Sequence, residues 1–252
     1  MADMPAIVLT CDRYHPLTRH MIQSYARLWP DHPLTFRVPY QADTGQLRRT
    51  PGAPIETVQT EPGIKQTVLS LLADIPDHEW LYWCIDDKYP IRLNVAKVKK
   101  VHQCILSLED RSIAGIAFVR CRRWRKQQYL VDESFHVSDG ALFGWGGVDC
   151  VRRKDYSHIW LHQFLRAGVL RTLFQAFPDA VTGAKELDAI KNRLALPDAH
   201  RLYVTTNSYA VFGESTSRGR LTANVVKSMR KSGQPIPETF DVCEKRIIIG
   251  KR

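Results

Sequence analysis

Six consecutive apolar residues, Trp80–Ile85, end abruptly in two aspartates, and this feature constrains the fold more than any other in the chain. A continuous apolar run of this length is typical of a strand buried on both faces, as in a parallel sheet covered by helices. Two adjacent carboxylates are costly to bury without partners. We therefore expect Asp86 and Asp87 to face a polar cleft where the strand ends.

Strand-like and helix-like segments alternate through the first half of the chain. The apolar patterns predict strands over residues 6–10, 34–38, 55–59, 80–85 and 113–119 and helices over 15–29, 64–75 and 94–108. Pro16 stands in the first turn of its helix, where proline is tolerated, and Asn94 is a suitable N-cap. This alternation predicts an α/β fold, Rossmann-like, with a mostly parallel central sheet flanked by helices.

The second half of the sequence is less regular. Apolar residues at helical spacing predict a long helix over 156–177, and further helices over 187–196 and 221–229, with short strands over 141–143 and 202–205. No segment has the composition of a linker. We expect one catalytic domain over residues 1–232, followed by an extended tail over 233–252.

Composition narrows the cellular setting of this 252-residue chain. No apolar run approaches the roughly 20 residues that cross a bilayer, and no basic segment followed by an apolar stretch opens the sequence, so we expect a cytoplasmic protein. The six cysteines show no C-x-x-C spacing, which favours reduced thiols over disulfides or a zinc site. A formal charge of +10, with basic clusters at 120–126, 152–154 and 218–252, favours polyanionic partners: nucleic acid, anionic lipid or phosphorylated small molecules.

The ends of two predicted strands supply candidate ligand-binding groups. Ligands of parallel sheets bind beyond the carboxyl ends of the strands, which places Asp12 and Arg13 on the same rim as Asp86 and Asp87. Paired carboxylates attract Mg²⁺ or Mn²⁺, which commonly share such ligands with substrate phosphates. Asp86 and Asp87 are therefore predicted metal ligands; the alternative is a loop or helix-capping pair of acids tied to Lys88 or Arg92.

Other candidate groups come from the second half. Arg218 and Arg220 lie in a Gly-, Ser- and Thr-rich loop that opens a predicted helix, a position suited to binding an anion. Trp145 lies among glycines and is a candidate for the wall of an acceptor pocket. For these three residues, solvated or packed side chains are the alternative.

The order of these motifs resembles the GT-A-type nucleotide-sugar glycosyltransferases, of the kind that build bacterial polysaccharide or lipopolysaccharide. The resemblance is carried by the residues Thr10 to Arg13 at the first strand's end, by the acidic pair 86–87, and by Lys185, Glu186, Leu187 and Asp188 further on. The family usually has Asp-x-Asp or a run of acids at the pair. Here Lys88 follows, and a basic side chain that faces the diphosphate is the alternative to a metal.

The resemblance implies a hexosyltransferase that moves a sugar from a nucleoside-diphosphate sugar to a hydroxyl of a glycan or lipid-linked acceptor, with Mn²⁺ or Mg²⁺ as cofactor. It implies a carboxylate general base, for which the candidates, in order, are Asp188, Glu186 and Asp139. Donor-binding residues would be Thr10, Asp12, Arg13, Lys65, Asp86, Asp87 and Lys88. The basic clusters would then suit peripheral contact with an anionic membrane at its cytoplasmic surface.

Two other functions remain open from the sequence. One is a nucleic-acid-binding protein that uses the basic cluster 120–126, with Trp124 and Tyr129 as stacking groups, although no zinc-finger, RNP or helix-turn-helix motif accompanies it. The other is an inactive relative of the transferases that only binds nucleotide sugar. We expect a nucleotide-sugar partner rather than nucleic acid.

Overall fold

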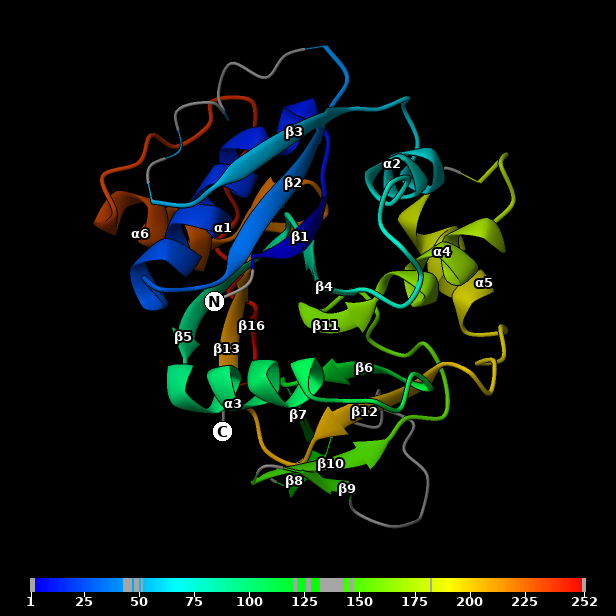
Figure 1. Ribbon diagram of the computed structural model, residues 1–252. Helices are drawn as coiled ribbons and strands as arrows, with labels where there is room; N and C mark the ends of the chain where they lie inside the picture. Colours follow the sequence, from blue (N-terminus) through cyan, green and yellow to red (C-terminus); the bar gives the residue numbers. More distant parts are fainter. Residues whose placement is uncertain are drawn as a thin grey trace.

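The computed structural model describes residues 3–42, 47, 50, 52–119, 122–125, 128–131, 143–145, 147–181 and 183–250. Its centre is a nine-stranded mixed sheet with the strand order β3-β2-β1-β4-β11-β6-β12-β10-β9 (Figure 1). The first four strands along the chain are mutually parallel neighbours at one side: β1 (Met4–Leu9), β2 (Leu34–Tyr40), β3 (Ile55–Gln59) and β4 (Trp80–Ile85). All six residues of β4 are buried, as the apolar run predicts.

The other half of the sheet is less uniform in direction. β11 (Gln163–Arg166) is antiparallel to both β4 and β6 (Ile113–Ala117), and β12 (Arg201–Thr205) is parallel to β6. β10 (Val148–Arg152) and β9 (Phe143–Trp145) complete the sheet with antiparallel pairings. Of the nine strands in the described sheet, only β10 and β11 run against the rest. The prediction of an α/β fold with a mostly parallel sheet is confirmed.

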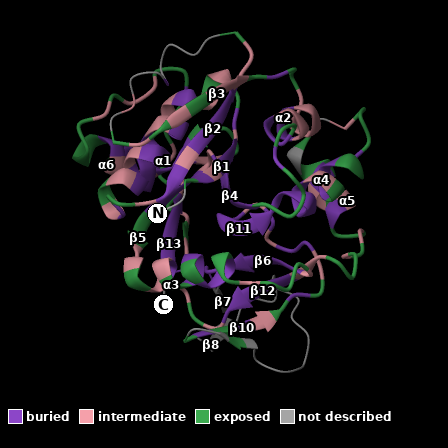
Figure 2. Ribbon diagram, in the orientation of Figure 1, coloured by how far each residue is buried: buried purple, intermediate pink, exposed green. Residues whose placement is uncertain are grey.

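Helices cover both faces of the sheet. On one face, α1 (His15–Leu28), α3 (Val95–Leu106) and α6 (Ala223–Lys231) contribute to one apolar cluster; on the other, α2 (Ile64–Leu71), α4 (Ala167–Gln175) and α5 (Ala184–Lys191) contribute to a second (Figure 1). Side chains of β1 alternate between them, since Ala6 and Val8 face the first cluster and Ile7 the second. Figure 2 shows the central strands β4 and β11 buried between these layers.

The prediction of a long helix over 156–177 is wrong. Residues 157–160 form turns, β11 follows, and only Ala167–Gln175 is helical. Every residue of β11 is buried because strands flank it on both sides, and its polar members find partners there: Arg166 Nε, for example, donates to the carbonyl of Ile113 at 3.0 Å. A strand that is buried on both faces shows no alternation of apolar and polar residues. The apolar residues of this segment therefore also fit a helical pattern.

A second, small sheet has the order β16-β13-β5 and combines β5 (Lys88–Leu93), β13 (Ala210–Glu214) and β16 (Ile248–Ile249). The remaining elements are the 3₁₀ turn η1 (Asp12–Tyr14) and two hairpins, β7 (Arg122–Arg125) with β8 (Gln128–Val131) and β14 (Thr216–Ser217) with β15 (Arg220–Leu221). This small sheet was not predicted, and its first strand begins directly after the acidic pair.

The segment after α6 runs back along the molecule. The amide of Cys243 donates to Leu221 at 2.8 Å, and the amide of Glu214 donates to Ile247 at 3.0 Å. The division into a domain over 1–232 and a tail over 233–252 stays a prediction. In the part of the chain that the structure describes, no helix combines the length and apolar character needed to span a bilayer.

Candidate functional site

The turn at Asp86 and Asp87 connects β4 of the large sheet to β5 of the small one. The amide of Asp86 donates to the carbonyl of Leu9 at the end of β1 (3.2 Å), and the amide of Ser215, just after β13, donates to the carbonyl of Asp87 (2.5 Å). Main-chain hydrogen bonds from both sheets therefore hold the acidic pair in place.

A cavity of about 600 Å³ opens at this turn, beyond the carboxyl ends of β1 and β4. Its floor consists of strand ends: Leu9, Thr10, Cys11, Ile85, Asp86, Asp87 and Lys88. Its walls come from other elements: Tyr14, Ile64, Trp160, Lys185, Asp188 and Thr216. Five of the predicted site residues, Thr10, Asp86, Asp87, Lys88 and Asp188, thus line one cavity.

A further cavity of about 440 Å³ adjoins the first, because the two share Leu9, Thr10, Cys11 and Ile64 as lining residues. It adds Gln41 from the end of β2 and three residues at the start of α2: Pro62, Gly63 and Thr67. Together the two cavities form a continuous depression along the carboxyl ends of β2, β1 and β4, where ligands of parallel sheets bind.

Lys88 is buried beside the acidic pair. Its Nζ lies 3.0 Å from Asp87 Oδ1 and 3.8 Å from Glu214 Oε1, and only 7% of the residue is exposed. The pairing of β5 with β13 places Lys88 opposite Glu214 in register. Burial raises the pKa of Glu214, an effect that the charge of Lys88 partly offsets. The ammonium group thus lies between two carboxylates.

Asp86 differs from Asp87 in its electrostatic environment. Burial and the neighbouring charge of Asp87 raise the pKa of Asp86 to about 7, although Thr10 and Lys88 act in the opposite direction. A large fraction of Asp86 is therefore protonated at neutral pH. The adjacent thiol of Cys11 has its pKa raised by burial and by the charge of Asp86, so it is not an activated nucleophile.

The donor set at this turn does not fit a divalent cation as it stands. Mg²⁺ and Mn²⁺ need several oxygen ligands, whereas Asp87 Oδ1 already accepts from the Lys88 ammonium. Within the part of the chain that the structure describes, no group of three or more histidine, cysteine or acidic side chains is placed to hold a metal ion. The assignment of Asp86 and Asp87 as ligands of Mn²⁺ or Mg²⁺ stays a prediction that metal binding has to test.

Asp188, in α5, also lines the cavity and is held through one oxygen. Its Oδ1 accepts a hydrogen bond from Trp160 Nε1 at 2.8 Å and lies 3.0 Å from the Nζ of buried Lys191. Burial acts to raise the pKa of Asp188, but the hydrogen bonds from Lys191 and Trp160 together lower it below its usual value. Glu186, on the same helix, is exposed and does not line the cavity. Asp139 lies outside the described residues.

Asp12 and Arg13 lie next to the cavity rather than in its wall. The Asp12 carboxylate accepts from the amides of Gln41 (2.9 Å) and Ala42 (2.8 Å), which ties the end of β1 to the end of β2. The Arg13 guanidinium lies 4.9 Å from the centre of the Phe240 ring. Their roles in nucleotide binding stay predictions.

The other predicted ligand-binding residues lie apart from the cavity or outside the described side chains. Lys65 forms an ion pair with Asp179 at 2.7 Å. Arg218 and Arg220 are exposed in the β14–β15 hairpin. Of Trp145 only the backbone is described, as part of β9. None of these roles is tested by this geometry.

The basic clusters are not uniform surfaces. In the cluster 152–154, Arg153 is only 1% exposed and donates to Gln163 Oε1 at 2.8 Å, so it is not available to a polyanion. The side chains of the cluster 120–126 lie outside the described residues. The nucleic-acid alternative therefore stays a prediction.

The sequence patterns do not indicate two contributors to the site. Trp160 lies within the predicted helix over 156–177, which gives no indication of its contact with Asp188. Glu214 is not among the predicted site residues, although it follows the apolar residues 209–213 just as Asp86 follows residues 80–85. An acid that ends an apolar run was the available signal.

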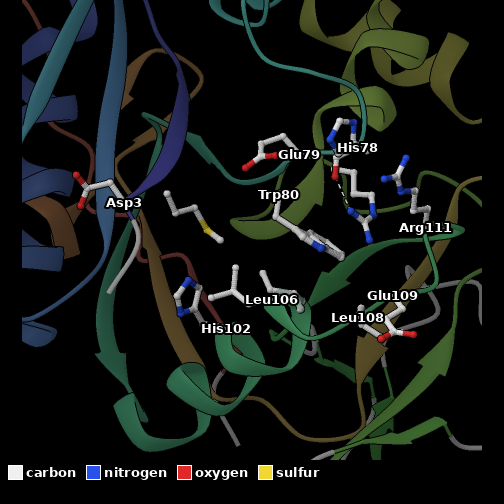
Figure 3. A pocket seen from close by; sticks show the side chains of 12 residues that line it. Asp3, His78, Glu79, Trp80, His102, Leu106, Leu108, Glu109 and Arg111 are labelled. Atoms are coloured by element: carbon white, nitrogen blue, oxygen red, sulfur yellow. Dashed lines mark hydrogen bonds between the residues drawn. The ribbon is translucent and has the colours of Figure 1, made fainter.

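Another cavity, of about 400 Å³, lies at the opposite edge of the sheet, at the amino ends of β1 and β4. Figure 3 shows the Trp80 indole, with His102 and Leu106 of α3, among the side chains that line it. The Arg166 guanidinium stacks on Trp80 at 4.6 Å. None of the predicted site residues lines this cavity, so the depression at Asp86 is the candidate site.

No family model matches the chain, and no curated protein matches its sequence. Among solved structures, it is similar to S. aureus TarS, with 13% identity and a TM-score of 0.49 over 94% of this chain and 41% of that one. It is also similar to TarS 1–349 in complex with UDP-GlcNAc, with 15% identity and a TM-score of 0.48 over 82% of this chain and 57% of that one. A third similar structure is the galactosyltransferase LgtC in complex with donor and acceptor sugar analogs. Its sequence identity is 11% and its TM-score 0.42, over 95% of this chain and 87% of that one. The chain spans 59% of the length of the TarS 1–349 structure solved alone.

Proposed function

We propose that this chain is a glycosyltransferase that binds a nucleoside-diphosphate sugar in the depression at Asp86 and transfers the sugar to an acceptor hydroxyl. The observation that carries the proposal is one cavity with a buried ammonium, Lys88, on its floor and an ionised carboxylate, Asp188, on its wall. A leaving diphosphate needs positive charge, and an acceptor hydroxyl needs a base.

The smaller cavity suits the nucleoside. Leu9 and Ile64 offer apolar contacts for the faces of the base, and the side chains of Gln41, Thr10 and Thr67 offer hydrogen bonds for its edge and the ribose. The two cavities adjoin at the end of β1. A donor placed this way has its diphosphate near Lys88 and its sugar in the larger cavity.

Asp188 would act as the general base. The acceptor oxygen attacks the anomeric carbon, the bond from that carbon to the diphosphate oxygen breaks, and its electron pair leaves with the nucleoside diphosphate. The acceptor proton passes to Asp188. Because Trp160 and Lys191 hold Oδ1, we assign the proton to Oδ2. Such a single displacement inverts the anomeric configuration.

The proposal extends to a GT-A-type enzyme that transfers a hexosyl group to a glycan or lipid-linked hydroxyl. Exposed basic residues of α6, Lys227, Arg230 and Lys231, support peripheral contact with an anionic membrane, where such an acceptor would lie.

The first test is ligand binding followed by turnover. A thermal-shift screen of UDP-, GDP-, CMP- and dTDP-sugars is expected to identify one stabilising donor, and calorimetry then gives its affinity. With that donor, release of the nucleoside diphosphate to water or to an added acceptor reports turnover. Asp188→Asn is expected to retain donor affinity and to lose about 10²- to 10⁴-fold in turnover.

Glu186→Gln is the matched comparison, since it removes a carboxylate two residues away that does not line the cavity. It is expected to leave turnover unchanged. A folded protein that binds no nucleotide sugar, or an Asp188→Asn variant with full turnover, contradicts the proposal. Binding without any turnover in the wild type indicates the inactive relative.

A further inference from the structure

The candidate donor site contains a cation of its own. A developing diphosphate charge is neutralised by a bound divalent ion or by a protein cation. Here the Lys88 ammonium lies beside the acidic pair, 3.0 Å from Asp87 Oδ1 and 3.8 Å from Glu214 Oε1, and lines the same cavity. One oxygen of Asp87, a predicted metal ligand, is therefore already engaged by a protein cation.

The fold gives Lys88 little freedom to leave. β5 and β13 pair in a register that sets Lys88 against Glu214 and Tyr89 against Gly213. The side chain of Lys88 is only 9% exposed, and a buried ammonium is stable only with oppositely charged partners. Displacing it from Asp87 would leave that charge buried without its nearest partner. A divalent ion beside it would also be repelled.

The ammonium is suited to a bridging position. Its positive charge contacts Asp87 and also lines the cavity, so a phosphate group bound there would share the ammonium with that carboxylate. Lys185, an exposed residue of α5, also lines this cavity. The lining therefore includes a second positive charge besides that of Lys88.

We propose that Lys88 supplies the positive charge that holds the donor's diphosphate, and that nucleotide binding by this chain is independent of divalent cations. This inference rests on the proposed function and replaces the expected Mn²⁺ or Mg²⁺ with a side chain. The two carboxylates then serve to position the ammonium rather than to ligate a metal.

The wild-type protein provides the first measurement. Calorimetry with UDP, GDP, CDP and dTDP is performed in excess EDTA, in Mg²⁺ and in Mn²⁺. We expect the nucleotide that binds to do so with the same dissociation constant in all three conditions. Electron paramagnetic resonance of Mn²⁺ titrated alone is expected to show no ion bound to the protein.

Variants then test whether the positive charge that binds the nucleotide comes from Lys88. Lys88→Met is expected to weaken nucleotide binding by about 10- to 100-fold, the loss for one charge-assisted hydrogen bond, while Lys88→Arg keeps most of the affinity. Lys99→Met is the control because Lys99 pairs with Asp31 away from the cavity, and it is expected to bind as the wild type does. Circular dichroism verifies that each variant is folded.

The outcomes are separable. Nucleotide binding that requires Mg²⁺ or Mn²⁺ and disappears in EDTA overturns this inference and leaves the proposed function in place. A folded Lys88→Met variant with wild-type affinity also overturns it. If no nucleoside diphosphate or nucleotide sugar binds in any condition, the proposed function fails and the inference fails with it. Should Lys88→Met not fold, the wild-type comparison with EDTA still decides the question of the cation.

Discussion

Three carboxylates near the depression have their pKa values moved in different directions. Burial and the charge of Asp87 raise the pKa of Asp86 to about 7, and burial raises that of Glu214. The pKa of Asp188 is lowered because the hydrogen bonds from Lys191 and Trp160 outweigh the effect of its burial. Carboxyl groups whose pKa values differ in this way can take different roles at the same pH. At neutral pH Asp188 is ionised, as the proposed general base has to be, whereas Asp86 is protonated in a large share of molecules.

Trp160→Phe tests the positioning of Asp188. Loss of the indole N–H removes one of the two hydrogen bonds that lower the pKa of Asp188, so this pKa is expected to rise. The acidic limb of the kcat/KM profile against pH should then move to higher pH, with turnover at neutral pH reduced by less than in Asp188→Asn. The aromatic ring that packs on Phe174 is retained. An unchanged acidic limb would show that Trp160 does not act through Asp188.

At this scale, residues that mark strand ends were predictable and their partners were not. Asp86 and Asp87 follow an apolar run, a local signal, and Asp188 came from a motif resemblance. Lys191 pairs with Asp188 from within the same helix. Trp160 contacts Asp188 from a turn 28 residues earlier in the sequence, so this contact depends on the tertiary fold. Residues of this second kind carry no periodic signal in one sequence.

Among the elements, the pairing of β5 with β13 sets the position of Lys88. β5 contains Pro90, which lacks an amide donor, and it is accommodated on an edge strand where the register with Phe212 shifts. Because of this proline, β5 has no clear strand pattern in the sequence, and β11 has none because all of its residues are buried. The strands β3 and β4 and the cap of α3, where Asn94 Oδ1 accepts from Lys97, follow local patterns and were predicted.

Gly213→Ala tests this pairing. A Cβ at Gly213 would lie 2.6 Å from Asn224 Nδ2 and 2.7 Å from Tyr89 Cζ, and Tyr89 is buried and hydrogen-bonded to Asn224 at 3.0 Å. We expect a loss of about 1–3 kcal/mol in the free energy of unfolding, measured by urea denaturation. Gly183→Ala is the control, since its Cβ would meet only ordinary contacts. Equal stability of the two variants would contradict the close packing described.

For the whole molecule, buried histidines link stability to pH. Burial lowers the pKa of His162 to about 3 and that of His20 to about 4, from an ordinary value of 6.5. Each stays neutral in the folded protein while it gains a proton in the unfolded chain below pH 6.5. Its contribution to stability is therefore complete above pH 6.5 and is lost as the pH falls toward its folded value. Asp86, with a raised pKa, acts in the opposite direction between pH 7 and 4 and offsets about one histidine.

We therefore expect the free energy of unfolding to fall between pH 6.5 and 4. The contribution of each histidine has a limiting slope of about 1.4 kcal/mol per pH unit. His20→Gln should flatten this dependence by up to one such slope, as determined by urea denaturation at several pH values. If the wild type and His20→Gln lose stability in parallel on acidification, His20 is not the buried neutral group described here.

The antiparallel insertion of β11 has a consequence for how the chain folds during synthesis. β4 and β6 lie early in the sequence, yet each borders β11 and not the other. Until residues 163–166 leave the ribosome, both strands present an unpaired apolar edge, the kind of surface on which nascent chains aggregate. β11 can fill the place between β4 and β6 only after residue 166 has been made, so fragments that stop before that residue are poor candidates for independent expression.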